Sequence, residues 1–311
     1  MRSAWVVVVA LVLGTGIASR ADSIGDIKAG NAALARGDAD SAIALYTKAL
    51  GADELSVENR VLAHENRCNA YRAIEAYELA LADCKTAIQL GPEEAFAYLQ
   101  QCIIYNTLSD FDAAISNCAT ASRIRPDNID AHIYGCAAFG NKGDFPRASA
   151  ECDAALRLNP ADTTALENRG WIEFATENFG AAARTLRGAP EVFRGLHRDI
   201  WIFLARMRAG DSEAPNDLRK APPVTDPWSV TLADFLLGNV PQAELRARAQ
   251  SGDMNREKGC DAIFVIAEQH LGQNSDLARP LLEEIVRDCT EFRISEQVVA
   301  AAELQRLDRA K

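Results

Sequence analysis

The sequence predicts an all-α protein whose helical hairpins stack into a superhelix, an α-solenoid. Three observations predict this fold: a period of 34 residues, helical spacing within each period, and a proline near the end of several units. Two alanine series keep the period and lie seven residues apart: Ala80, Ala114, Ala148 and Ala182, then Ala87, Ala121, Ala155 and Ala189. A spacing of seven places the two alanines of a unit on one helix face. Pro92, Pro126 and Pro160 end the units, because proline cannot continue a helix.

Composition excludes several classes of protein. The 311 residues include 33 Lys and Arg against 44 Asp and Glu, a net charge of −11, and 48% are hydrophobic. These values are typical of a folded globular protein rather than a disordered chain. The acidic balance argues against nucleic acid or an anionic membrane as the main partner, since both attract Lys and Arg clusters.

Residues 1–21 have the layout of a secretory signal peptide. A basic start at Met1-Arg2 precedes an apolar run from Ala4 to Leu13, and small residues follow. Signal peptides combine these three features in this order. We expect cleavage after Ala18 or Ala21 rather than a retained anchor, because spanning a bilayer takes about 20 apolar residues. The expected location is therefore the periplasm or the outside of the cell, with no stable membrane insertion after cleavage.

Residues 22–190 divide into about five clear repeats, each predicted to form two helices. The units begin at about residues 23, 61, 95, 129 and 163, and a turn such as Lys142-Gly143-Asp144 separates the helices. The first unit is out of phase by four residues, so a longer linker is expected around Gly51–Glu58.

These repeats resemble tetratricopeptide repeats (TPRs), helical hairpins of 34 residues. The resemblance is carried by Gly30-Asn31-Ala32 with Gly37-Asp38 and Ala42, and by Gly143-Asp144-Phe145 with Ala148 and Ala155. The chain departs from the pattern where the first helix usually carries an early aromatic residue, at His64, Tyr98, His132 and Leu166. TPR arrays serve many unrelated tasks, so the resemblance implies a fold and a binding role but no particular partner.

Residues 191–311 are predicted to be a degenerate, TPR-like helical region. Helices are expected over Asp199–Met207 and Pro227–Leu237, and a last hairpin over Ala262–His270 and Leu277–Val286. The Trp201 segment and the Leu237-Gly238-Asn239 turn resemble the C-terminal part of NlpI-type periplasmic TPR lipoproteins. That resemblance implies an adaptor that brings envelope enzymes to their targets. The first cysteine is Cys68, so the chain has no lipobox near the cleavage point.

The cysteines follow the repeat. Cys68, Cys102 and Cys136 are spaced by 34, as are Cys84, Cys118 and Cys152, and the flanking units hold a glycine with Tyr46 or Leu186 in the same two slots. Small and large residues facing each other across a hairpin are a suitable place for a disulfide, and export favours oxidation. We expect four bridges: Cys68–Cys84, Cys102–Cys118, Cys136–Cys152 and Cys260–Cys289. The alternatives are bridges between units, such as Cys84–Cys102, or free buried thiols.

The sequence contains no catalytic motif, phosphate-binding loop, cofactor motif or metal-ligand spacing, so we expect a protein that is not an enzyme and holds no metal or cofactor. By resemblance, the first helices line a concave groove. Its expected ligand-binding residues are Asn31, Asn69, Arg72, Leu99, Ile103, Asn106, Ile133, Asn141, Trp171 and Phe174. Trp171 and Phe174 are the expected anchors, and acidic residues at 65 and 167 favour a neutral or basic protein or peptide. The alternative is that the superhelix itself covers several of these positions.

The predicted function is a periplasmic TPR scaffold that binds a protein or peptide and recruits envelope enzymes. A structural or assembly subunit of an envelope or secretion complex is the first alternative. An enzyme of unrecognised type is the second.

Overall fold

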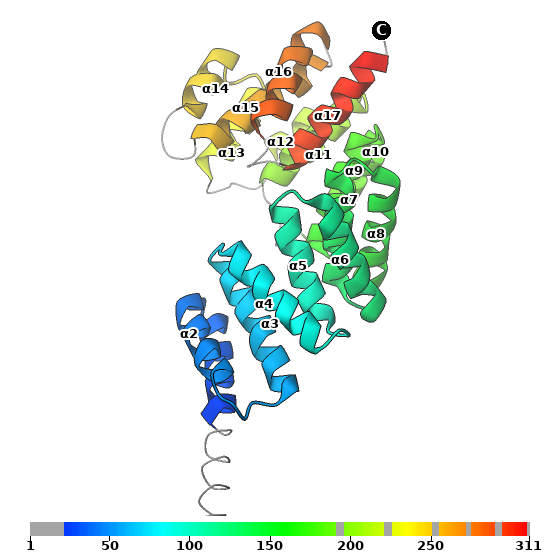
Figure 1. The fold of residues 1–311 in the computed structure, drawn as a ribbon. Coiled ribbons are helices and arrows are strands. Elements are labelled where there is room, and N and C mark those ends of the chain that lie inside the picture. Colours follow the sequence, from blue (N-terminus) through cyan, green and yellow to red (C-terminus); the bar gives the residue numbers. More distant parts are fainter. Residues whose placement is uncertain are drawn as a thin grey trace, which may run out of the picture. The chain divides into compact units, whose positions relative to one another are not determined.

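The computed structural model describes residues 22–190, 196–220, 226–250, 255–271, 275–289 and 294–309. The regular structure of these residues is α-helical, as the fold class predicted (Figure 1). The expected signal peptide lies outside the described residues. Among the helices that are described, none is both long and apolar enough to cross a membrane.

The chain forms two compact units, Met1–Tyr134 and Gly135–Lys311, and each is described by itself. The described part of the first unit begins with a helix over residues 22–35. It continues with α2 (Ala39–Leu50), α3 (Val57–Ala73), α4 (Tyr77–Leu90), α5 (Ala95–Thr107), α6 (Phe111–Ile124) and the start of α7 (Ile129–Asn141). The sequence predicted a boundary at residue 190, between the clear repeats and the degenerate helical region. That boundary stays a prediction.

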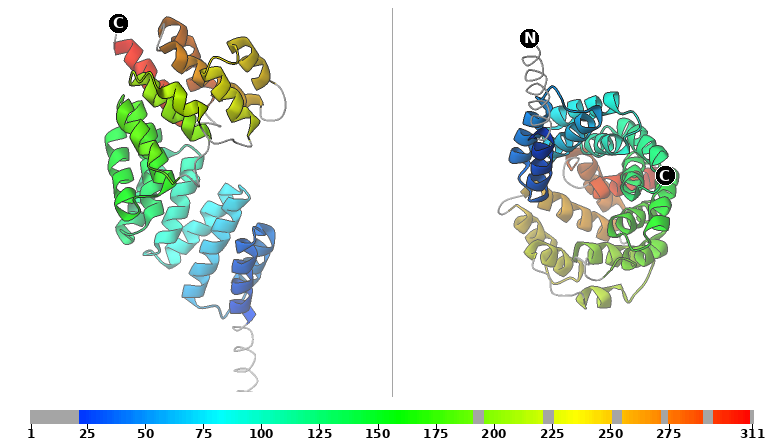
Figure 2. Two further views of the ribbon diagram at one scale, coloured as in Figure 1. Left: turned by 180° about the vertical axis from the view of Figure 1, so that it is seen from behind. Right: turned by 90° about the horizontal axis from the view of Figure 1, so that it is seen from below.

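The second unit contains the rest of α7 and the helices that follow it (Figure 2). These are α8 (Phe145–Leu158), α9 (Thr163–Ala175), α10 (Phe179–Arg187), α11 (Leu196–Arg208), α12 (Ala214–Arg219), α13 (Pro227–Leu236), α14 (Gln242–Ala249), α15 (Asn255–Leu271), α16 (Ser275–Asp288) and α17 (Ile294–Arg309). The last hairpin that the sequence predicted corresponds to α15 and α16. The sequence did not predict α17 as an element that packs on the repeats.

Each hairpin turn places one residue in the left-handed region of the backbone. The position recurs with the repeat at Glu75, Ser109, Gly143 and Glu177, with φ of 60°, 60°, 80° and 63°. Aspartates then begin several of the second helices: the carboxylate of Asp144, for example, accepts a hydrogen bond from the backbone N–H of Arg147 at 3.2 Å. Such caps satisfy an otherwise unpaired donor at the helix N-terminus.

The repeated alanines lie where helices approach each other. Ala80, Ala114, Ala148 and Ala182 have no exposed surface, and Ala87, Ala121 and Ala155 have none either. A small side chain at these positions allows two backbones to pack closely. Larger side chains there have no room without displacing a neighbouring helix.

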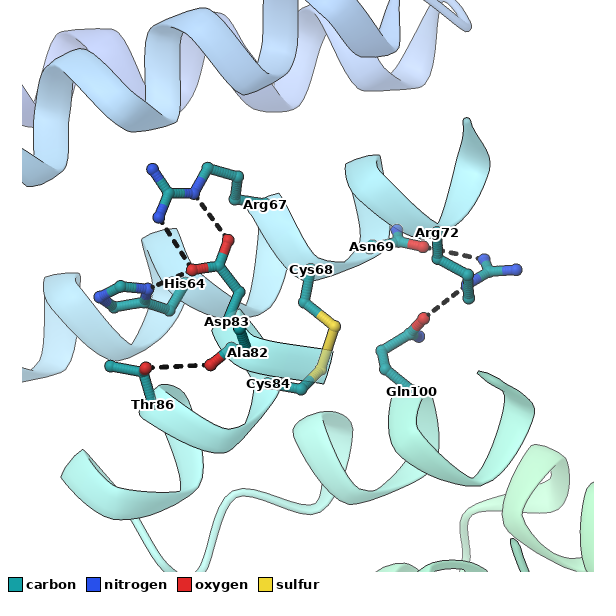
Figure 3. The surroundings of a disulfide bond; sticks show 10 residues. All are labelled: His64, Arg67, Cys68, Asn69, Arg72, Ala82, Asp83, Cys84, Thr86 and Gln100. Atoms are coloured by element: carbon teal, nitrogen blue, oxygen red, sulfur yellow. Dashed lines mark hydrogen bonds and ion pairs between the residues drawn. A yellow bond between two sulfur atoms is a disulfide. The ribbon is translucent and has the colours of Figure 1, made fainter. Parts of the chain in front are cut away.

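The facing slots of each hairpin hold either a small and a large residue or a disulfide. A Cβ atom added to Gly30 would lie 2.6 Å from Cε1 of Tyr46, and one added to Gly170 would lie 2.5 Å from Cγ of Leu186. In the three hairpins between them, cysteines occupy both slots, with Cα–Cα distances of 5.5, 5.3 and 5.2 Å. The fourth disulfide, Cys260–Cys289, joins α15 to the residue after α16 with a Cα–Cα distance of 5.8 Å. These are the four predicted pairs, and Figure 3 shows the first of them.

The second unit has a large apolar core centred on Trp201 of α11. The Trp201 ring lies 5.0 Å from that of Phe264 and 5.1 Å from that of Phe174 between ring centroids. Val299 and Ala300 of α17 are fully buried in the same core. Helix α17 is therefore an integral part of the second unit, although its sequence is outside the repeat.

Candidate functional site

The first helix of each repeat has one position that stays partly accessible. Asn31 is exposed, and the residues in the same slot of later repeats are half-buried. Those residues are Asn69, Ile103, Ala137 and Trp171. Asn141, at the end of α7, is also half-buried. Within each unit, these positions hold the side chains of the predicted groove that a partner can reach.

Several predicted groove residues are buried, and their expected exposure was wrong. The slot that holds Glu65, Leu99 and Ile133 is 6%, 5% and 5% exposed. Leu99 packs against Ala121 and Ala131, so this slot forms the interface between neighbouring repeats rather than a free surface. Asn106 is 8% exposed and donates from Nδ2 to the backbone oxygen of Tyr134 at 3.1 Å. In these positions the stacking of the repeats covers the side chains, which is the alternative that the sequence left open.

Phe174 is the clearest correction, because the sequence placed it beside Trp171 as a ligand anchor. Its side chain has no exposed surface. The ring lies 5.0 Å from the ring of Phe179 and 5.1 Å from that of Trp201, edge-on to both. Phe174 is therefore a core residue. Trp171 also contacts Trp201, at 6.4 Å between ring centroids, but remains half-buried.

In the first unit, hydrogen bonds hold the polar groove residues in place. Arg72 donates from Nη2 to Oδ1 of Asn69 at 2.9 Å and from Nε to Oε1 of Gln100 at 2.8 Å (Figure 3). Asn31 accepts bonds at Oδ1 from the Tyr46 hydroxyl at 2.7 Å and from Nδ2 of Asn66 at 2.9 Å. These contacts order the amide groups before any ligand arrives.

An ion cluster beside the first disulfide was not predicted. Asp83 receives hydrogen bonds from Nε and Nη2 of Arg67 at 2.6 and 2.8 Å, and it bonds Nδ1 of His64 at 2.8 Å (Figure 3). Burial alone would raise the pKa of Asp83, but the bonds and charges of Arg67 and His64 hold it below its usual value. Arg67 also donates to the Thr47 hydroxyl at 2.8 Å. The cluster therefore ties α2, α3 and α4 together, and His64 has a structural role in it.

The second unit contains a pocket of about 210 Å³ between α7, α9 and α17. Two predicted groove residues, Asn141 and Trp171, line it. The other lining residues are Cys136, Ala137, Gly140, Phe145, Asn168, Ile172, Val298 and Val299. Among the described residues that line this pocket, none has a charged side chain. We call it the α7–α9–α17 pocket.

Buried charges hold α17 in the position that completes the pocket. Arg208 donates from Nη1 to Glu268 at 2.7 Å and to Glu303 of α17 at 2.8 Å. Arg306, also on α17, bonds Glu303 and the backbone oxygen of Ala175 at the end of α9. Burial raises the pKa of Glu268 against the opposing effect of Arg208. These bonds fix α17 against α9, α11 and α15.

The pocket was only partly recognisable from the sequence. Ala137 and Gly140 stand in slots that hold Ile103 and Asn106 one repeat earlier, and this loss of side-chain volume was visible in the repeat alignment. Nothing in the repeat pattern pointed to Val298 or Val299, since α17 lies outside the periodic part. Among the described residues, no group of three or more His, Cys, Asp and Glu side chains is arranged to hold a metal ion.

Comparison with known proteins agrees with this architecture. A family model described as tetratricopeptide repeat matches residues 27–95 and 138–193. The fold is similar to that of a tetratricopeptide repeat protein from Parabacteroides merdae ATCC 43184, with 14% identity, 84% of this chain and 98% of that chain covered, and a TM-score of 0.57. The chain thus matches the tetratricopeptide repeat in these two segments, and the shared helical fold agrees with that match.

Two other solved structures have a lower similarity score. One is YrrB, a TPR protein with an unusual peptide-binding site, with 20% identity, 64% of this chain and 92% of that chain covered, and a TM-score of 0.45. The other is MamA from Desulfovibrio magneticus RS-1, from residue 41 to its end, with 13% identity, coverages of 53% and 92%, and a TM-score of 0.48. No curated protein sequence matches the chain.

Proposed function

We propose that this chain is a non-enzymatic TPR scaffold of the bacterial envelope that binds a protein or peptide. TPR proteins generally act by binding proteins or peptides, and the matched repeats bring that expectation to this chain. The observation that carries the proposal is the uncharged α7–α9–α17 pocket of the second unit, which Asn141 and Trp171 help to line. A concave, mostly apolar site with a few polar groups is the usual form of a ligand pocket.

The disulfides support an oxidising compartment, which we propose to be the periplasm. All eight cysteines of the sequence lie among the described residues, and all eight are paired. Structural disulfides are rare in the cytosol of most organisms because thiol reductants keep cysteines reduced there. Alkylation of the exported protein under denaturing, non-reducing conditions should label no cysteine. Labelling at two or more cysteines contradicts the proposal, and a Cys84–Cys102 peptide would favour the inter-unit scheme.

The structure removes part of the reason for expecting a neutral or basic partner. The expected neutral or basic ligand was inferred from Glu65 and Glu167 at the groove edge, and Glu65 is buried. Glu167 stays half-buried, and burial raises its pKa although Arg198 and His197 oppose this effect. We retain the preference for a neutral partner at the α7–α9–α17 pocket, whose lining is uncharged. A basic partner rests on Glu167 and on the net charge of −11.

The adaptor role is implied by the resemblance of the C-terminal region to NlpI-type proteins. The alternative is a subunit of an envelope or secretion complex with no transient ligand. Panning of a displayed random-peptide library against the purified chain separates them: a scaffold should select peptides that bind reversibly to the folded monomer. An obligate subunit should select none and should be oligomeric by sedimentation. The measurement should include Asp112→Ala on α6 as a surface control.

A further inference from the structure

We infer that the α7–α9–α17 pocket binds one uncharged apolar side chain of the partner, of the size of leucine or phenylalanine. This inference deepens the proposed scaffold function and rests on it. The non-repeat helix α17 forms one wall of the pocket, and two small residues of α7 open the other.

Gly140 is not required by the packing around it. A Cβ atom added there would lie 3.8 Å from Cγ1 of Ile172 and 4.0 Å from Cβ of Ala148, which are ordinary contact distances. Gly30 and Gly170 differ, since an added Cβ would lie 2.6 and 2.5 Å from the facing side chain. Glycine inside a helix is destabilising relative to alanine. At Gly140 this disadvantage has no steric cause, and its structural effect is to leave the pocket open.

The neighbouring slot on α7 has the same effect. Ala137 is half-buried and lines the pocket, whereas the equivalent residues are Ile103 one repeat earlier and Trp171 one repeat later. The two small residues lie three apart on α7, so they share a helix face. Together they remove the side-chain volume that fills this position in the other repeats.

The size and charge of the pocket identify the class of ligand group. Its volume of about 210 Å³ exceeds that of engineered apolar cavities of about 150 Å³ that bind benzene. Apolar walls come from Trp171, Ile172 and Phe145, and the polar groups are the amides of Asn141 and Asn168. A charged group would lose its hydration without gaining an ionic partner among these residues. An uncharged apolar side chain loses no such hydration.

Helix α17 shows that this face accepts apolar side chains. Val299 is fully buried in the core of the second unit, and Val298 beside it is half-buried at the pocket wall. The Arg208–Glu303 and Arg306–Ala175 bonds hold the helix in place. The pocket is therefore preformed, which lowers the entropic cost of binding.

The test uses three probes on the full-length, disulfide-bonded protein: N-acetyl-leucinamide, N-acetyl-phenylalaninamide and N-acetyl-lysinamide. NMR titration follows the Trp171 indole N–H and the methyl groups of Ile172, Val298 and Val299. We expect saturable shifts of these signals with the leucine and phenylalanine probes, and at least tenfold weaker binding of the lysine probe. Absence of shifts in the wild type, or equal binding of the lysine probe, overturns the inference.

Two variants fill the pocket from α7. Ala137→Ile installs the residue of the preceding repeat and should abolish the shifts, and Gly140→Ala should weaken probe binding at least threefold. Gly140→Ala is expected to unfold at the same or a higher temperature than the wild type, so it decides the question if Ala137→Ile fails to fold. Ala119→Ile makes the same change on the exposed face of α6 and should leave binding unaltered. Unchanged probe binding in folded filled variants contradicts the inference.

Failure of the pocket is distinguishable from failure of the scaffold function. Library-selected peptides that bind the wild type and Ala137→Ile equally well would retain the scaffold and reject the pocket as its anchor site. Peptides that lose binding in Ala137→Ile but not in Ala119→Ile, and that share a leucine- or phenylalanine-sized residue, support both.

Discussion

Replacing Glu65 by glutamine should stabilise the protein at alkaline pH and change little in acid. Glu65 lies on α3 in a slot that holds Leu99 and Ile133 in later repeats, and it is 6% exposed. Its Oε1 atom has no hydrogen-bond partner among the described residues. Burial raises the pKa of Glu65 to about 7, with a further contribution from the charge of Glu94 and an opposing backbone hydrogen bond from Ala97.

The size of the effect follows from the pKa. The pKa of Glu65 rises from 4.5 to about 7 on folding. Ionisation of this carboxyl therefore lowers the protein's free energy of unfolding by up to about 3 kcal/mol, at about 1.4 kcal/mol per pKa unit. The folded state holds this proton more tightly than the unfolded state. The stabilisation is therefore fully present below pH 4.5 and is lost as the pH rises through about 7. Glutamine has nearly the same shape and no charge to bury.

Chemical denaturation of wild type and Glu65→Gln at pH 5 and pH 8, followed by circular dichroism, measures the effect. We expect the variant to be more stable by about 1–3 kcal/mol at pH 8 and by less than about 1 kcal/mol at pH 5, just above the unfolded pKa of 4.5. Taking the difference between the two proteins cancels other titrating groups, Glu268 among them. Glu94→Gln is the matched control: removing this exposed charge should give part of the alkaline gain. A variant that is less stable than wild type at pH 8, or that keeps the same pH dependence, refutes the reasoning.

Three further substitutions test the repeat geometry by chemical denaturation. Ser109→Gly should stabilise by about 1 kcal/mol, because Ser109 has a φ of 60° that glycine adopts without strain; a loss of stability would contradict the turn assignment. Gly170→Ala should destabilise, since its Cβ would lie 2.5 Å from Cγ of Leu186, and combining it with Leu186→Ala should relieve the overlap. Ala114→Leu should cost about 1–3 kcal/mol at a fully buried helix contact, far more than Asp112→Ala, and an unchanged midpoint would mean that the register is wrong.

Local features of this protein were predictable from the sequence. A hairpin repeat contacts chiefly its neighbours, so its period, turns and small-residue slots are all encoded within 34 residues. The same locality explains the disulfides: Cys68 and Cys84 face each other because their slots hold Gly30 and Tyr46, or Gly170 and Leu186, in the flanking hairpins. For the candidate site, two residues that the sequence placed in the groove, Asn141 and Trp171, line the α7–α9–α17 pocket, and their role in binding stays a prediction.

The tertiary structure decided which faces of the helices are covered. Phe174 and Trp171 are both apolar and lie three apart on α9, yet only Trp171 lines the pocket, because Trp201 and Phe179 enclose the Phe174 ring. The 34-residue period of the sequence does not predict which repeat residues contact a segment outside the repeats, such as α17. Val298 reaches the pocket from α17, more than 120 residues after α9, and the ion pairs that hold it join residues as distant as Arg208 and Glu303. Such contacts depend on how the helices fold back in three dimensions, and therefore only the structure could identify them.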